Sequence, residues 1–172
     1  MLKRVAAPVT DIGAEETALA TDLMDTMLAS PSCVGVAAPQ IGVSIRAFSV
    51  NVEGHKKADS CHGAFVLFNP VLILARHLAQ GREGCLSVPD FTAEVKRAQR
   101  ILLRAWTPDE KEVAIEADGL LAVALQHELD HLDGKLFIDR LSRLKRDLYR
   151  ARQRKLDRQG RPASSGRTTH VI

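Results

Sequence analysis

The sequence predicts an α+β domain, in which small mixed or antiparallel β-sheets pack around one central helix and a further helix follows at the C-terminus. Residues 120–125 are six apolar residues in succession, which indicates a helix buried on every side. Apolar and alternating segments between residues 44 and 117 are typical of strands. After residue 139 the pattern becomes amphipathic and basic, as in an exposed helix.

The first third of the chain predicts one helix and one strand. We expect a helix over residues 14–29, capped by Asp11 or Thr10, because apolar residues recur there at helical spacing. These residues are Leu19, Leu23, Met24, Met27 and Leu28. The stretch CVGVAAPQIG is a loop of small residues, and it leads into a strand over residues 44–50.

The middle of the chain predicts an exposed loop and three strands. Residues 51–63 are polar and contain the loop. The segment AFVLFNPVLIL predicts a buried strand interrupted by the turn pair Asn69–Pro70, and the tight segment EGCLSVP follows. Two further strands are expected over residues 94–106 and 111–117, and the alternation in the second predicts a half-buried strand.

The central helix is predicted over residues 119–132, with Asp118 as its cap and Gly134 as its stop. We expect residues 1–139 to form the main domain and residues 140–158 a basic helix. Residues 159–172 are rich in Gly, Ser, Pro and Arg and predict a disordered tail.

Composition excludes several classes of protein. No apolar run approaches the ~18 residues of a membrane span, and no secretory signal is recognisable, so a cytoplasmic protein without membrane contact is expected. Three cysteines are too few for a disulfide framework. From residue 140 onward, 11 Lys and Arg stand against two Asp, whereas the preceding residues are mildly acidic.

The pattern His-Glu-Leu-Asp-His, residues 127–131, carries the chemistry. His127 and His131 are four residues apart, so both imidazoles project from one helix face and can bind one metal ion. Glu128 lies beside the ligands, where a carboxylate can act as general base on a water at the metal. The alternative is a solvated helix end, but burial of such a group without a metal would be costly.

A catalytic metal site needs a third protein ligand. Cys85 is favoured, because the glycine-containing segment EGCLSVP can hold a thiolate in fixed geometry. The other candidates are Cys61 with His62, Cys33, His55, His77 and a distant acid.

Three segments, CVGVAAPQ, EGCLSVP and QHELDHLDG, resemble the three signature motifs of peptide deformylases in order and separation. The similarity extends over about residues 2–142 and identifies residues 1–139 as a peptide deformylase-like catalytic domain. The resemblance implies hydrolysis of the N-formyl group from the initiator methionine of nascent peptides, with release of formate. N-formylmethionyl peptides would then be the substrates.

Carried over by position, the resemblance implies Cys85, His127 and His131 as metal ligands and Glu128 as proton carrier. Gln40 and the backbone N–H of Leu86 would donate hydrogen bonds to the formyl oxygen, as an oxyanion requires. The remaining implied residues are Val34, Gly35 and Gly84, whose backbone would contact an extended substrate.

Helix geometry and the resemblance together indicate further residues that would support the site. Val123 and Ala124 lie on the face of His127 and are expected either to line a pocket for the methionine side chain or to pack in the core. Asp130 points away from the ligands, and Arg97 matches the family's position for a buried partner of this acid.

One thiolate with two imidazoles suits Fe²⁺, Zn²⁺, Ni²⁺ or Co²⁺. The resemblance favours one Fe²⁺ in the cell, with the other ions able to replace it. The cationic helix at residues 140–158 predicts docking to ribosomal RNA near emerging chains, against the simpler interpretation of a solvated helix end.

Two departures from the family pattern stand out. The first motif usually begins with Gly, and here Cys33 occupies that position, which predicts altered substrate fit and, if φ is positive there, a strained backbone. The family also usually has roughly ten further residues at the N-terminus.

Two rival functions remain open at this point. One is another zincin-type metallopeptidase, which would normally take His or Glu as third ligand. The other is a deformylase-like domain without activity that binds RNA or a partner through its basic tail.

Overall fold

The computed structural model describes residues 2–58 and 62–158. Helix α1 (Ala14–Leu28) is followed by β1 (Gly35–Ala37), the short 3-10 helix η1 (Ala38–Ile41) and β2 (Ala47–Val50). Strands β3 (Phe65–Cys85), β4 (Val88–Trp106) and β5 (Glu112–Asp118) come next. Helix α2 (Gly119–Leu132), the 3-10 helix η2 (Phe137–Arg140) and α3 (Arg143–Arg158) complete the described chain.

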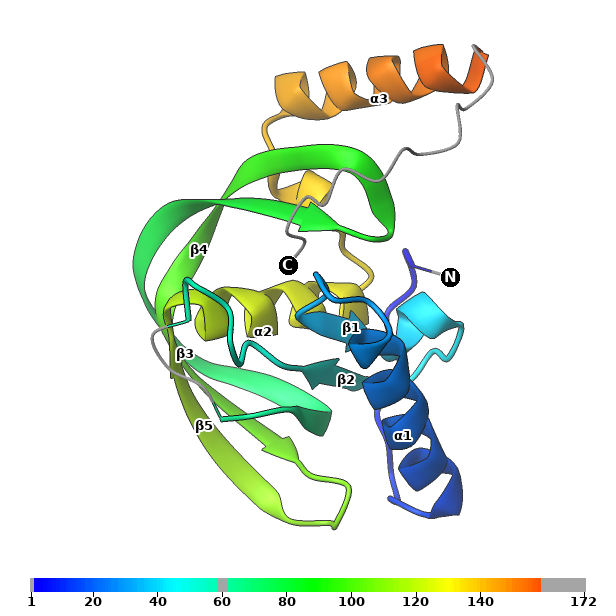
Figure 1. The fold of residues 1–172 in the computed structure, drawn as a ribbon, viewed down its shortest axis with the longest axis vertical. Helices are drawn as coiled ribbons and strands as arrows, with labels where there is room; N and C mark the ends of the chain where they lie inside the picture. Colours follow the sequence, from blue (N-terminus) through cyan, green and yellow to red (C-terminus); the bar gives the residue numbers. More distant parts are fainter. Residues whose placement is uncertain (1, 59–61, 159–172) are drawn as a thin grey trace.

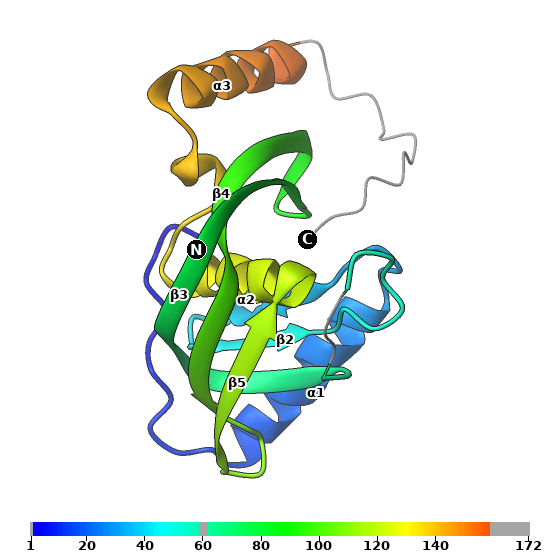
Figure 2. The same ribbon diagram turned by 90° about the vertical axis from the view of Figure 1, so that its left-hand side faces the viewer.

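The five strands form one antiparallel sheet in the order β1-β2-β3-β4-β5, which curls around α2 (Figures 1 and 2). The α+β class and the central helix are therefore confirmed. The described residues form a single sheet, where the sequence predicted several small ones. A lone parallel bridge joins Ala7 to Ile45.

Helix α2 is buried on every side, as its apolar run predicts. It packs against β4, β1, β5 and β2, and 12 of its residues are buried. Gly134 follows with φ +68°, a conformation that suits glycine, so the predicted stop is confirmed. Asp118 occupies the N-cap position, but its side chain makes no capping hydrogen bond.

Strands β3 and β4 are much longer than predicted. Asn69 and Pro70 do not end β3; one register shift, between Phe68 and Val71, spans both residues as an irregularity in the pairing with β4. The prediction of a buried strand also fails beyond this point, since residues 71–80 are exposed. Strand β2 pairs with β3 only at Phe65–Phe68, so the later part of β3 has a strand neighbour on one side only among the described residues. The strand ends at Cys85, which brings this residue to α2.

The N-terminal elements differ in detail from expectation. Helix α1 is capped at Gly13, where the N–H donates to Glu16 Oε2 at 3.0 Å, and neither Asp11 nor Thr10 caps it. Strand β2 begins three residues later than predicted. Residues 35–37, expected in a loop, form the edge strand β1.

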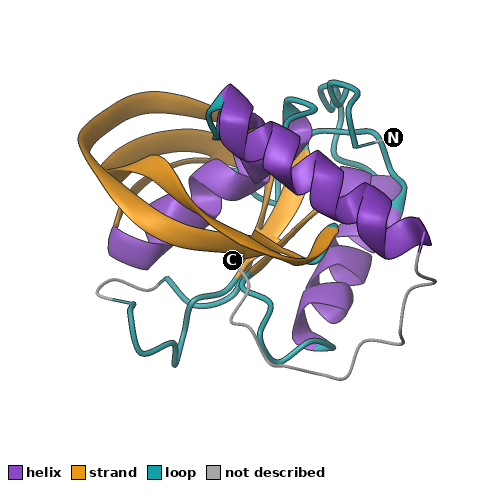
Figure 3. Cartoon of the chain, turned by 90° about the horizontal axis from the view of Figure 1, so that it is seen from above, coloured by secondary structure: helices purple, strands orange, loops and turns teal. Residues whose placement is uncertain are grey.

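Helix α3 begins at Arg143, after η2, and not at residue 140 as predicted. It lies across the end of the β3–β4 hairpin, apart from α1 (Figures 1 and 3). The predicted disordered tail lies outside the described residues. No helix in the described ranges has the length and apolarity needed to cross a membrane.

Gly134 gives a test of the packing around α2. A Cβ at this residue would lie 2.9 Å from backbone atoms of Lys3 and Arg4, and its φ is positive. We expect Gly134→Ala to lower the free energy of unfolding by at least about 1–2 kcal/mol, measured by denaturant titration. Gly81→Ala is the matched control, because nothing lies within 4 Å of that Cβ position. Equal stability of the two variants would contradict this packing.

Candidate metal centre

Cys85 from the end of β3 meets His127 and His131 from α2. Their ligand atoms lie within 4.8 Å of one another, and Cys85 Sγ is 3.3 Å from His131 Nε2. All three side chains are buried. Among the described residues, this is the one cluster of three or more His, Cys, Asp or Glu side chains with such spacing.

The donor set fits a divalent transition metal. His127 Nδ1 is 3.0 Å from Glu83 Oε2, whereas His127 Nε2 is buried without a partner among the described residues. A buried ring nitrogen in that state is costly unless an ion or water satisfies it. One soft sulfur and two imidazoles suit Fe²⁺, Zn²⁺, Co²⁺ or Ni²⁺.

Glu83 is a candidate functional residue that the sequence analysis did not predict. Its carboxylate accepts from Arg97 Nε at 2.7 Å and Arg97 Nη2 at 2.9 Å, besides contacting His127. Arg97 Nη1 donates to Asp130 Oδ2 at 2.6 Å, so the predicted pairing of Arg97 with Asp130 is confirmed. Arg140 holds the same acid through two bonds of 2.5 Å. Glu83, Arg97 and Asp130 are buried and form a chain of charges that begins at the candidate ligand His127, while Arg140 is at the exposed end.

The electrostatics of this chain keep its acids ionised. Burial alone would raise the pKa of Glu83, but the hydrogen bonds from Arg97 and His127 outweigh it and lower that pKa. Burial likewise opposes ionisation of Asp130, and Arg140 and Arg97 lower its pKa. The ionised Glu83 accepts a hydrogen bond from the His127 Nδ1–H. This leaves His127 Nε2 as the nitrogen that is available to bind a metal ion.

The two histidines respond differently to burial. Burial would lower the pKa of His127, but contacts with Cys85 and Glu83 raise it to about 10. Burial and the neighbouring charge of His127 lower the pKa of His131 to about 3. The pKa values of the two imidazoles therefore lie on opposite sides of the ordinary histidine value.

Glu128 lies beside the ligands, 1% exposed, and its Oε2 has no partner among the described residues. Burial raises its pKa to about 7. A Cβ on Gly35 would lie 2.6 Å from Glu128 Oε1, so only glycine leaves room for this carboxylate. The glycine of β1 and the acid of α2 are thus packed against each other.

Gln40 is oriented by its own loop. Its Oε1 accepts the Ala37 N–H at 2.7 Å, so its Nε2 points the other way, 3.1 Å from Ser87 Oγ and 3.8 Å from Cys85 Sγ. Leu86 lies in the two-residue turn between β3 and β4, directly after Cys85. Both residues are therefore next to the ligand sulfur.

The remaining expected substrate contacts lie on either side of the metal cluster. The Val34 carbonyl accepts the Asn51 N–H at 2.9 Å, while Gly35 follows in the edge strand β1. Gly84 lies in β3 opposite Thr92. Val123 is 8% exposed, and Ala124 is fully buried in the main core.

The other candidate ligands are not brought to the cluster. Cys33 is half-buried and is outside the ligand group, while His55 and His77 also lie elsewhere. His62 Nε2 is 3.2 Å from the Glu116 carbonyl. Cys61 lies outside the described residues.

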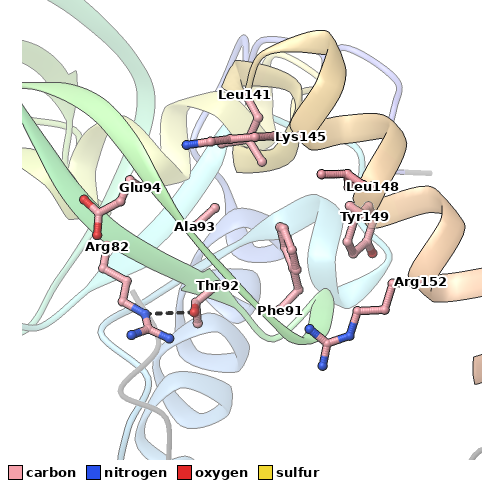
Figure 4. Close-up of a pocket in the computed structure, with 10 residues that line it drawn as sticks. All are labelled: Arg82, Phe91, Thr92, Ala93, Glu94, Leu141, Lys145, Leu148, Tyr149 and Arg152. Carbon is pink, nitrogen blue, oxygen red and sulfur yellow. Dashed lines mark hydrogen bonds between the residues drawn. The ribbon is translucent and has the colours of Figure 1, made fainter.

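A cavity of about 450 Å³ opens between α3 and the β3–β4 hairpin (Figure 4). Its lining is Arg82, Phe91, Thr92, Ala93, Glu94, Leu141, Lys145, Leu148, Tyr149 and Arg152. The Phe91 ring lies 4.5 Å from Tyr149 and stacks on Phe137, which in turn stacks on His127. Tyr149 therefore attaches α3 to the main domain. None of the residues of the metal cluster lines this cavity, so the cavity and the cluster are separate sites.

Glu83 can be tested by its effect on the metal. We expect Glu83→Gln to weaken metal affinity by about 10–100-fold, because the charged acceptor that fixes His127 is lost. Competition with a chromophoric chelator measures this affinity directly. Glu94→Gln, an exposed acid on β4, is the control. Unchanged affinity in Glu83→Gln would show that His127 is oriented without this carboxylate.

Comparisons with known proteins agree on one family. The model of the family described as polypeptide deformylase matches residues 1–147. The peptide deformylase of Alkalilimnicola ehrlichii is 42% identical over 167 residues, covering 97% of this chain and 91% of the relative. That of Syntrophobacter fumaroxidans is 41% identical, covering 90% and 89%. The crystal structure of a peptide deformylase from Legionella pneumophila is similar with a TM-score of 0.81 and 39% identity, covering 94% and 93%.

Proposed function

The chain belongs to the peptide deformylase family, and we infer from this that it removes the N-formyl group from the initiator methionine of nascent polypeptides, releasing formate. The observation that carries this function is the meeting of Cys85 with His127 and His131 beside Glu128. A third ligand that is Cys separates the site from metallopeptidases with His or Glu in that place. The family match over the catalytic residues favours an enzyme over a domain that only binds RNA or a partner.

We propose that Cys85, His127 and His131 together hold one divalent ion, with Fe²⁺ as the ion in the cell. Bound there, the ion would polarise the formyl carbonyl and lower the pKa of a water molecule. Zn²⁺, Ni²⁺ and Co²⁺ suit the same donors and are expected to replace it.

Glu128 is proposed to move the proton. Its carboxylate accepts a proton from the attacking water and delivers it to the departing amine nitrogen, so that formate and a free N-terminus result. Its burial and its unpartnered Oε2 support this role, because no competing hydrogen bond within the described residues occupies that oxygen.

Gln40 and Leu86 are proposed to stabilise the oxygen of the formyl group as it gains negative charge. The fixed orientation of Gln40 supports this, since its Oε1 is held by Ala37 and its Nε2 is directed to the Cys85 side. A neutral side-chain donor and a backbone N–H placed in advance lower the barrier without reorganisation.

The peptide is proposed to bind as an extended strand between β1 and the end of β3. Gly35 on one side and Gly84 on the other supply the backbone groups. The Val34 carbonyl accepts from the Asn51 N–H on the β2 side, so the contact predicted for this carbonyl is not part of the proposal. Val123 is proposed to line the pocket for the methionine side chain; it is buried on the ligand-bearing helix. Ala124 is proposed to do so through its proximity, although it also packs in the core.

The experiment that tests this function is formate release from formyl-Met-Ala-Ser, with acetyl-Met-Ala-Ser as the matched control. We expect release from the formyl peptide alone, because the acetyl methyl group adds bulk at the reacting carbon. A protein that carries one metal equivalent and leaves the formyl peptide intact would contradict the proposal.

Helix α3 is proposed to dock on ribosomal RNA, which would keep the enzyme, in the cytoplasm, near emerging chains. Its exposed basic residues support this: Arg143, Lys145, Arg150, Arg152, Arg154, Lys155 and Arg158. Phosphate contacts of this kind release counterions, so affinity falls steeply with salt.

The docking proposal predicts a specific loss. We expect the triple variant Arg143→Ala, Arg150→Ala and Arg154→Ala to cosediment poorly with purified ribosomes at low salt, with formate release from a short peptide unchanged. A triple variant of exposed basic residues outside α3, Lys56→Ala, Lys57→Ala and Lys111→Ala, is the control. Equal cosedimentation of both variants would count against docking through α3.

A further inference from the structure

Cys33, which replaces the usual first glycine of the motif, is hydrogen-bonded to β1, the strand along which the peptide is proposed to bind. Its Sγ donates to the Gly35 carbonyl at 3.1 Å. Burial raises the pKa of this thiol to about 11, so the sulfur keeps its proton at neutral pH and remains a donor. At neutral pH the thiol therefore occupies the Gly35 carbonyl, which is a hydrogen-bond acceptor of β1.

The Gly35 carbonyl lies on the outer edge of the sheet. In an antiparallel strand, the N–H and C=O of successive residues point to opposite sides. Because the Val34 carbonyl accepts from Asn51 on the β2 side, the Gly35 carbonyl points away from β2. Strand β1 is the last strand of the sheet in the described chain, so an extended peptide could add on this side.

This edge is also next to the reacting groups. A Cβ on Gly35 would touch the Glu128 carboxylate. Cys33 precedes Gly35 by two residues, and its Sγ is hydrogen-bonded to the Gly35 carbonyl. A peptide that adds along this edge for reaction at the metal cluster therefore meets the Cys33 thiol at that carbonyl.

We propose that Cys33 limits the affinity of this enzyme for its formyl peptide, because its thiol occupies the Gly35 carbonyl that a substrate peptide N–H must reach. The inference rests on the proposed function and adds a residue that determines substrate affinity. When the peptide binds, its N–H replaces the Cys33 S–H as the donor to the Gly35 carbonyl oxygen. The displaced thiol must then rotate away.

Backbone strain does not account for an effect of Cys33. The described non-glycine residues with positive φ are Asn69, His77 and Glu110. Cys33 is not among them, so the strain that a conformation reserved for glycine would impose is absent at this described residue. The influence of Cys33 therefore acts through its side chain.

Steady-state kinetics with formyl-Met-Ala-Ser test the proposal on the metal-loaded full chain. We expect Cys33→Ala to lower KM about two- to fivefold, with kcat changed by less than about twofold; this corresponds to about 0.4–1 kcal/mol at 1.4 kcal/mol per tenfold. Cys33→Ser keeps a hydroxyl donor in less volume, and its KM is expected to equal or exceed that of the natural protein. Cys61→Ala serves as the control for loss of a thiol.

Two results would overturn the proposal. An unchanged KM in Cys33→Ala would show that the thiol does not compete, and a KM in Cys33→Ser as low as in Cys33→Ala would assign the effect to bulk. Calorimetric titration of the same peptide into Glu128→Ala, with and without Cys33→Ala, measures the affinity independently of turnover. If the natural protein releases no formate, the proposed function itself fails, and the two failures are thereby distinguished.

Discussion

Replacing Glu128 by alanine is expected to reduce formate release by about 10²–10⁴-fold, the usual contribution of a positioned acid–base group. Glu128 is the buried carboxylate beside the ligands, and within the described residues no other acid has an unpartnered oxygen there. The metal content should stay at one equivalent, because Glu128 is not a member of the ligand cluster. Stopped-time assays of formate, together with metal analysis of the same sample, give both quantities.

The isosteric Glu128→Gln variant separates proton transfer from packing against Gly35. It keeps the side-chain volume and should lose activity to a similar extent. Glu15→Ala, an exposed acid on α1, is the surface control and should behave as the natural protein does. Full activity in Glu128→Gln would remove Glu128 as proton carrier and leave only a packing role.

The second large effect concerns the thiolate ligand. We expect Cys85→Ser to weaken metal affinity by more than about 100-fold, because a hydroxyl that stays protonated replaces a soft anionic donor. Loss of a ligand should exceed the about 10–100-fold loss expected at Glu83. Competition with a chelator of known affinity, followed by anaerobic gel filtration, measures the retained metal.

Cys33→Ala is the matched control for this loss. Its sulfur is hydrogen-bonded to the Gly35 carbonyl and is not a member of the ligand cluster. This variant should keep one metal equivalent. Tight metal binding by Cys85→Ser would contradict the assignment of Cys85 and would restore a His or Glu as third ligand.

Much of the fold was predictable because its central element has an unusual pattern. A helix with apolar residues all round can lie only in a core, so α2 and its stop at Gly134 follow from the sequence. The three residues brought together at the metal cluster also follow, since two lie one helical turn apart on α2 and the third stands in a motif of its own.

Other features depend on contacts between distant segments and left no local signal. Strand β1 has only three residues, and their small side chains are also typical of a loop. Glu83 stands two residues before Cys85, yet its bond to His127 exists only because β3 ends against α2. The exposure of the apolar residues near Leu74 has no signal in the local sequence. It goes with the short pairing between β2 and β3, which ends at Phe68.

The most direct test is to titrate metal-free protein with Fe²⁺ under anaerobic conditions and follow formate release from formyl-Met-Ala-Ser. We expect activity to rise linearly and to reach its plateau at one equivalent, with no activity before metal is added. Formate release without metal, or one bound equivalent without any formate release, would contradict a single metal at Cys85, His127 and His131 as the centre of the reaction.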